Sequence, residues 1–148
     1  MPYVANYPDT VQEILRDNKK YKPDCLRAMK RFRRAKAWRG SLTERGAKFE
    51  TLHRELCEVY GLNTTLRFGI LNDSSSGGSY FNPADDSITL SGRLSVVTYL
   101  HEFGHARGYD ERKACIFSVN LFRRIFPRSF ERATFNGHMV IQNNPTTP

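Results

Sequence analysis

The feature that most constrains this chain is the sequence HEFGH at residues 101–105, an HExxH motif. On an α-helix, side chains four residues apart lie about one turn apart on the same face, so His101 and His105 can direct both imidazoles to one point. Glu102 lies beside the first histidine, where it can reach a water molecule held at that point. Two neutral imidazoles with a carboxylate are a three-ligand set typical of catalytic zinc, with the fourth position open. The motif therefore predicts a helix here.

The residues around the motif favour this helix. Residues 94–100 carry no charge, and a set of positions follows helical spacing on the face expected to point inward. These positions are Val97, His101, Gly104, His105 and Gly108. Gly108 is expected to end the helix, because glycine readily adopts the left-handed conformation at a helix C-terminus. The alternative is that the two histidines are core residues of an amphipathic helix without a metal.

A second helical pattern begins at Asp110 and Glu111. Its inward positions are expected to be Ala114, Phe117, Ser118, Leu121, Phe122 and Ile125. Both acids lie at the edge of this stripe, so periodicity alone does not choose a third ligand. Asp110 occupies an N-cap position that suits its short side chain, which leaves the longer Glu111 to reach a metal. The alternative is that both acids only interact favourably with the helix dipole.

These residues carry a family resemblance. HEFGH followed by ERKACIFS at 111–118 resembles the zincin metallopeptidases, most closely the minimal gluzincins of the ImmA/IrrE type, which show HExGH and then E-x-x-A-x-x-F-A. The resemblance spans roughly residues 79–127. By position, it implies that His101, His105 and Glu111 are zinc ligands and that Glu102 is the general base.

The spacing between the two parts of the motif departs from the gluzincins. The connection from His105 to Glu111 is shorter than usual for them and equals that of the metzincins, HExxHxxGxxH/D. In that comparison Gly108 is the turn glycine, and Glu111 stands in place of histidine or aspartate. Both comparisons select Glu111 as the third ligand.

The expected fold class is α+β, a minimal zincin-like domain in which a small antiparallel sheet packs on the HExxH helix. In residues 64–72 the hydrophobic residues Leu66, Phe68 and Ile70 occupy every second position and so share one face, which predicts a strand. Residues 79–82 and 86–91 predict two further short strands. In the family the edge strand pairs with an extended peptide substrate, and either of these two segments is a candidate for that edge.

Additional helices are expected on both sides of this core. The patterns predict helices at 8–17 and 23–38, and a third helix that begins with a capping box at Ser41 and Glu44 and ends at Gly61. Phe49, Leu52, Leu56 and Val59 are expected to form the buried stripe of that third helix. A last short helix is expected to run through 130–135, followed by a break at Asn136-Gly137 and a tail at 142–148. We expect one domain, 1–148, with a helical part at 1–62, the catalytic core at 63–127, and the C-terminal helix and tail at 128–148.

Composition limits the class of protein. The 148 residues are 39% hydrophobic and 12% aromatic, as in an ordinary globular domain. Residues 1–10 lack a leader-like pattern and no stretch is long enough to span a membrane, so we expect a cytoplasmic protein with no membrane partner. Cys25, Cys57 and Cys115 form no CxxC pair and are expected to be reduced core residues.

The formal net charge is +8, and much of it lies on the second predicted helix. Between residues 27 and 39 there is no acid, and the basic residues are Arg27, Lys30, Arg31, Arg33, Arg34, Lys36 and Arg39. Cys25, Ala28, Met29, Phe32 and Ala35 are expected to face the core. One interpretation is a surface for nucleic acid or an acidic protein, to which Trp38 could add base stacking. The favoured interpretation is a solvated helix face, because no base-reading motif accompanies the charge.

Taken together, the motif and the resemblance predict a zinc-dependent metallopeptidase with a peptide or protein substrate and Glu102 as general base. Candidates for a group that stabilises the oxyanion are His138, Tyr80 and Tyr109. An alternative is a basic nucleic-acid- or repressor-binding module whose HExxH is structural or vestigial. A DNA-repair protease of the SprT type would need a histidine as third ligand and often a cysteine zinc module, and neither is evident.

Overall fold

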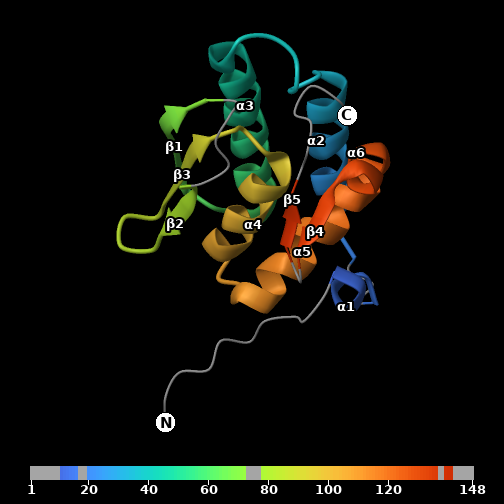
Figure 1. Ribbon diagram of the computed structural model, residues 1–148. Helices are drawn as coiled ribbons and strands as arrows, with labels where there is room; N and C mark the ends of the chain where they lie inside the picture. The colour runs from blue at the N-terminus through green and yellow to red at the C-terminus, as the bar shows by residue number, and fades with distance from the viewer. Residues whose placement is uncertain (1–10, 17–19, 73–77, 137–138, 142–148) are drawn as a thin grey trace.

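The computed structural model describes residues 11–16, 20–72, 78–136 and 139–141. These residues form an α+β fold in which helices pack against a small mixed sheet (Figure 1). The helices are α1 (Val11–Arg16), α2 (Pro23–Arg34), α3 (Leu42–Tyr60), α4 (Val96–Ala106), α5 (Glu111–Ile125) and α6 (Pro127–Arg132). The strands are β1 (Thr65–Leu71), β2 (Tyr80–Asn82), β3 (Ser87–Gly92), β4 (Thr134–Asn136) and β5 (Met139–Ile141). No described helix is long and apolar enough to cross a membrane.

The sheet differs from the antiparallel one that we predicted. Its strand order is β1-β3-β2, with β2 and β3 antiparallel but β1 and β3 parallel. A tight turn joins β2 to β3, which forces that pair to be antiparallel. Strand β1 then lies on the far side of β3, an order that residue alternation cannot reveal. Strand β2 is therefore an edge strand and β3 is central, which excludes 86–91 as the edge.

Strand β1 contains an irregularity that the sequence pattern did not predict. Phe68 lies opposite Leu90, whereas Leu71 lies opposite Gly92, so β1 holds one extra residue between these pairs. A bulge of this kind changes which side chains face the core. Leu71 packs against the core, while Ile70 is 85% exposed. The prediction that Ile70 shares the buried face of Leu66 and Phe68 is wrong for this reason.

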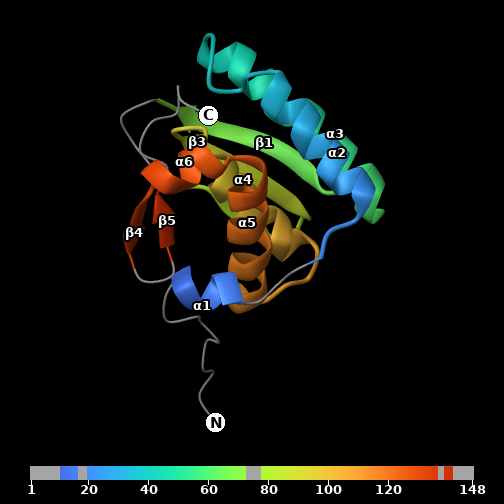
Figure 2. The same cartoon turned by 90° about the vertical axis from the view of Figure 1, so that its right-hand side faces the viewer.

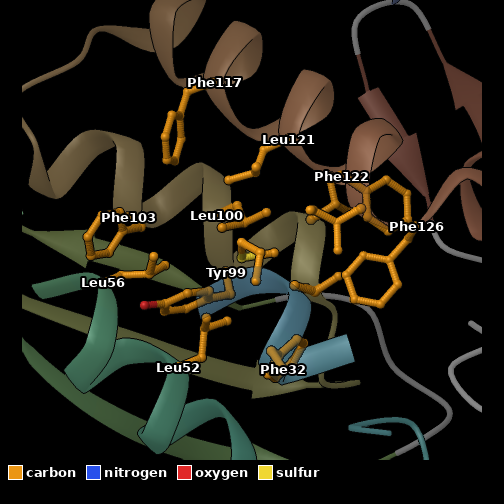
Figure 3. Close-up of a cluster of buried hydrophobic side chains, with 14 of the residues drawn as sticks. Phe32, Leu52, Leu56, Tyr99, Leu100, Phe103, Phe117, Leu121, Phe122 and Phe126 are labelled. Atoms are coloured by element: carbon orange, nitrogen blue, oxygen red, sulfur yellow. The ribbon is translucent and has the colours of Figure 1, made fainter. Parts of the chain in front are cut away.

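The helices cover one face of the three-stranded sheet in two layers. Helix α3 contacts β1 and helix α4 contacts β2 and β3, and α2 and α5 pack on these two helices (Figures 1 and 2). One continuous hydrophobic cluster joins the layers, and its largest members are aromatic (Figure 3). Phe103 of α4 stacks on Phe117 of α5 with ring centroids 6.3 Å apart. The site region of the chain therefore shares its core with the N-terminal helices.

The N-terminal helices follow the predicted pattern with one correction. Ser41 and Glu44 form the predicted capping box, and Gly61 ends α3 at a φ of 67°. Helix α2 ends at Arg34 rather than continuing to residue 38. The chain then turns, so Ala35 is exposed and Ala37 is buried in its place.

The prediction of a helix up to residue 135 is wrong, because the chain forms a pair of strands there. Helix α6 ends at Arg132, and β4 and β5 pair as antiparallel strands where a helix to residue 135 was expected. Asn-Gly at 136–137 is a strong hairpin signal, and we interpreted it only as a helix break. His138 and the tail at 142–148 lie outside the described residues.

Helices α4 and α5 approach each other closely at Gly104. A Cβ built on Gly104 would lie 3.1 Å from the Cα of Ala114 and 3.2 Å from its Cβ. Such distances leave no room for a methyl group unless the helices move apart. The small residues Gly104 and Ala114 therefore set the distance between the two helices.

We predict opposite effects for two glycine-to-alanine substitutions. Gly104→Ala should destabilise the fold by about 1–3 kcal/mol, because the methyl group overpacks the α4–α5 contact. Gly46→Ala is the matched control, since it also lies within a helix but its added Cβ would make only ordinary contact, 3.6 Å from the Phe68 ring. It should be neutral or stabilising by up to about 1 kcal/mol. Urea unfolding measures both, and equal effects would contradict the packing argument.

Candidate metal centre

The HExxH helix begins at Ser95, whose hydroxyl accepts a hydrogen bond from the N–H of Thr98 at 3.4 Å. Its fully buried face contains Tyr99, Leu100 and Phe103. The side chains of His101 and His105 lie beside that face, 21% and 24% exposed. The histidines thus lie at the border of the core, where a metal and a substrate can reach them.

The turn from α4 to α5 orients His105. The N–H of Tyr109 donates to the carbonyl of Gly104 and the N–H of Gly108 donates to that of His105, with Gly108 at a φ of 90°. This is a Schellman motif, so the prediction that Gly108 ends the helix is confirmed. The motif brings the carbonyl oxygen of Tyr109 to 2.9 Å from Nδ1 of His105. A carbonyl can only accept, so Nδ1 carries the proton and Nε2 of the neutral ring has a free lone pair.

The third candidate ligand arrives on α5. Asp110 caps this helix by accepting a hydrogen bond from the N–H of Lys113 at 2.8 Å, as predicted. Glu111 is thereby left free to point at the histidines. One of its carboxylate oxygens contacts Nε2 of His101, and the other lies 3.6 Å from Nε2 of His105. The structure thus brings together the three residues that we predicted as metal ligands, His101, His105 and Glu111.

The spacing of these atoms suits a tetrahedral metal. Zinc bound at about 2.0–2.1 Å to nitrogen or oxygen requires tetrahedral ligand atoms about 3.3 Å apart. The Nε2 atoms of His101 and His105 are 3.2 Å apart, close to that value. The direct contact of His101 with Glu111 is tighter than this value.

The electrostatics of the three groups agree with this interpretation. Hydrogen bonds to His101 and then His105 hold the pKa of Glu111 well below its usual range. The hydrogen bond to Glu111 raises the pKa of His105 to about 9, against the opposing effect of burial. Without metal, the site therefore retains a proton near its carboxylate at neutral pH. A divalent cation would replace that proton.

Cys115 is part of this site, although the sequence predicted only a core residue. It is buried, and His101, Glu111 and Cys115 form a group that could hold a metal ion. Its Sγ lies 3.8 Å from Nδ1 of His101 and 3.9 Å from Oε1 of Glu111. Burial, followed by the charge of Glu111, raises the pKa of the thiol to about 12. The available signal was its position one helical turn after Glu111, on the same side of α5.

The two possible ligand sets use different nitrogens of His101. The set of His101, His105 and Glu111 uses Nε2, whereas Cys115 faces Nδ1 of the same ring. In the first set, the Cys115 sulfur can accept the Nδ1 proton of His101 and hold the ring in position. Metal-bound histidines commonly donate their second ring nitrogen in this way.

Comparisons with protein-family models, with curated proteins and with solved structures found no match. The assignment of this site therefore rests on its residues and their geometry.

Glu102 lies between the imidazoles and the edge strand. Burial raises the pKa of its carboxyl, and the negative charge of Glu111 adds to this effect. The two imidazoles and a hydrogen bond from the backbone N–H of Phe81 oppose it. Glu102 thus connects the HExxH helix to β2, and its raised pKa suits a group that takes up and returns a proton.

The candidates for oxyanion stabilisation have different positions. Tyr80 lies on the edge strand β2 and is 52% exposed. The Tyr109 ring packs against Phe117, and the Arg107 guanidinium lies 4.7 Å from its centroid. The carbonyl of Tyr109 contacts His105, and both Tyr80 and Tyr109 remain candidates for oxyanion stabilisation.

We predict that zinc content separates the two ligand sets. His105→Ala should lose most bound zinc, whereas Cys115→Ser should retain it, because serine leaves both imidazole Nε2 atoms and the carboxylate in place. Asp110→Asn is the control, since it removes an acid beside Glu111 but keeps an N-cap residue. Elemental analysis of the purified variants gives the result. Loss of zinc in Cys115→Ser with retention in His105→Ala would establish the sulfur-containing set instead.

We predict that zinc affinity rises with pH. The folded pKa of His105, about 9, lies above its ordinary value, so below pH 9 zinc must displace the proton. Apparent affinity should increase about tenfold per pH unit between about pH 6.5 and 8, if one proton is released. Without zinc, the same pKa shift stabilises the fold at low pH, and this stability is lost as pH rises toward 9. Competition with a chromophoric chelator measures the affinity, and a pH-independent value would exclude a displaced proton.

Proposed function

We propose that this chain is a zinc-dependent metallopeptidase that hydrolyses a peptide bond. The observation that carries the proposal is the convergence of His101, His105 and Glu111, from two helices, beside the half-buried Glu102. The resemblance of these residues to the zincins, and to the minimal gluzincins in particular, agrees with this proposal. The ligands lie on helices rather than loops, which favours a fixed geometry.

His101, His105 and Glu111 would hold the ion. Bound there, zinc would polarise the scissile carbonyl and lower the pKa of its water to roughly 7. Glu102 is the general base: it accepts the proton of the attacking water and later passes it to the nitrogen of the leaving amine. The backbone N–H of Phe81 and the two imidazoles all lower the pKa of this carboxyl, in opposition to burial.

A peptide substrate fits the position of β2. This strand lies at the edge of the sheet and contacts the HExxH helix α4. An extended peptide can add to such an edge through main-chain hydrogen bonds. A substrate recognised in this way would pass directly beside Glu102.

The competing hypothesis is a structural zinc site with four protein ligands. Cys115 is the residue that could complete such a site, because it is the additional donor near His101 and Glu111 in the described part of the chain. However, it faces Nδ1 of His101, and the other ligand atoms face Nε2. One ion on Nε2 therefore keeps an open position for water, which favours the catalytic interpretation.

Glu102→Gln tests the proposal. The substitution should preserve zinc and fold but lower the cleavage rate by about a hundredfold to ten-thousandfold, because the general base is lost. The assay incubates zinc-loaded protein with a proteome-derived peptide library and identifies new termini by mass spectrometry.

Glu58→Gln serves as the control, because it also replaces a carboxylate by an amide but at an exposed residue of α3. Glu58→Gln should cleave at the wild-type rate. If Glu102→Gln, purified in the same way, does not cleave, a contaminating protease is excluded as the source of the activity. Equal cleavage by Glu102→Gln at equal zinc content would refute hydrolysis at this site. Absence of cleavage by the zinc-loaded wild type would refute a general peptidase activity.

A further inference from the structure

The other unusual feature of this chain is the positive charge of helix α2 and of the turn that follows it, residues 27–39. Residues 27–39 contain no acid, and we call their basic side chains the basic ridge. The basic ridge consists of Arg27, Lys30, Arg31, Arg33, Arg34, Lys36 and Arg39, all of them exposed. Because the whole chain has a formal charge of +8, most of the excess positive charge lies on this one element.

Only part of this charge is balanced within the fold. Arg27 pairs with Asp24, Arg31 pairs with Glu55 at 3.1 Å, and Arg33 donates to the carbonyl of Ile125 at 3.0 Å. Four members have no acid within ion-pair distance among the residues that the structure describes: Lys30, Arg34, Lys36 and Arg39. Concentrated like charges destabilise a compact fold unless a partner or counterions balance them.

The surface on either side of α2 is hollowed and also basic. Between α2 and α3 lies a hollow of about 250 Å³ whose lining includes Arg31, Lys48 and Glu55, the acid that pairs with Arg31. At the junction of α5 and α6 lies another of about 260 Å³, lined in part by Arg33 and Arg128. Helix α2 contributes Arg31 to the first hollow and Arg33 to the second. The surface is thus a basic ridge with two hollows beside it, each lined in part by basic side chains.

We propose that the basic ridge binds the phosphate backbone of a nucleic-acid duplex. A helix with its side chains is about 10–12 Å wide, close to the width of about 12 Å of the major groove of DNA. Cations on the helix and in both hollows would then face the phosphates of the two strands. Five of the seven ridge residues are arginines, whose planar guanidinium groups match phosphate oxygens in pairs.

An acidic protein partner fits this surface less well. Stable protein interfaces are centred on buried aromatic or aliphatic anchors. The large exposed hydrophobic residues of the described chain are Ile70 and Tyr80, and both lie on the sheet. Trp38 is half-buried and packs edge-on against Phe126 with ring centroids 6.4 Å apart. The expected binding is therefore electrostatic and independent of base sequence.

Salt-dependent binding to a labelled duplex tests the proposal, which does not depend on the metal centre. Fluorescence anisotropy of the full chain with a DNA duplex of about 20 base pairs should show binding in 50 mM salt. If four phosphates are contacted, affinity should fall by about a hundredfold in 200 mM salt. Lys30→Glu/Arg34→Glu should weaken binding at least tenfold in 50 mM salt and make the salt dependence less steep, by about two contacts.

The control carries the same change of net charge elsewhere. Arg54→Glu/Lys113→Glu alters exposed residues of α3 and α5 outside the basic ridge and both hollows, and it should bind the duplex within about threefold of wild type. Equal losses in both double variants would overturn the proposal, because net charge alone would then explain the binding. Absence of duplex binding in 50 mM salt would also overturn it, and ridge-dependent binding of polyglutamate without duplex binding would assign the surface to an acidic protein. Circular dichroism confirms that each variant is folded.

Discussion

The candidate metal centre depends on the close approach of α4 and α5 at Gly104 and Ala114. Because Gly104 has no side chain, the two helices lie near enough for Glu111 on α5 to touch His101 on α4. The short connection adds a second constraint, since its Schellman motif directs the Tyr109 carbonyl at His105. One packing contact and one turn thus position the three candidate ligands, and a wider helix separation would move Glu111 away from the two imidazoles.

The other side of α4 is held by a buried polar network. Nε2 of His53 lies 2.6 Å from the carbonyl of Thr64, and Nδ1 lies 2.7 Å from the hydroxyl of Tyr99. The carbonyl can only accept, so Nε2 donates and Nδ1 accepts from Tyr99. Burial lowers the pKa of His53, which keeps the ring neutral and this pattern intact. The network joins α3, the start of β1 and the HExxH helix, so α4 is fixed both toward the sheet and toward α5.

Local signals were sufficient where a residue's role depends on its neighbours in sequence. The HExxH helix, the N-cap at Asp110, the capping box at Ser41 and the end of α4 at Gly108 were all predictable, since each involves contacts within about one helical turn. Strand order, the bulge in β1 and the position of Cys115 beside His101 depend on pairs distant in sequence. A single sequence contains no direct record of those pairs. The hairpin of β4 and β5, in contrast, was predictable from the local Asn-Gly sequence.

The Nδ1 atoms of the two histidines have hydrogen-bond acceptors of different strength, so the two rings are not equally fixed in orientation. Nδ1 of His105 donates to a backbone carbonyl fixed by the turn, while Nδ1 of His101 faces the sulfur of Cys115 at 3.8 Å. Sulfur is the weaker acceptor, so His101 is the less firmly oriented ligand. His101 is also the residue shared by both possible ligand sets. Rotation of this one ring would therefore change the set of donors, whereas His105 can contribute only Nε2.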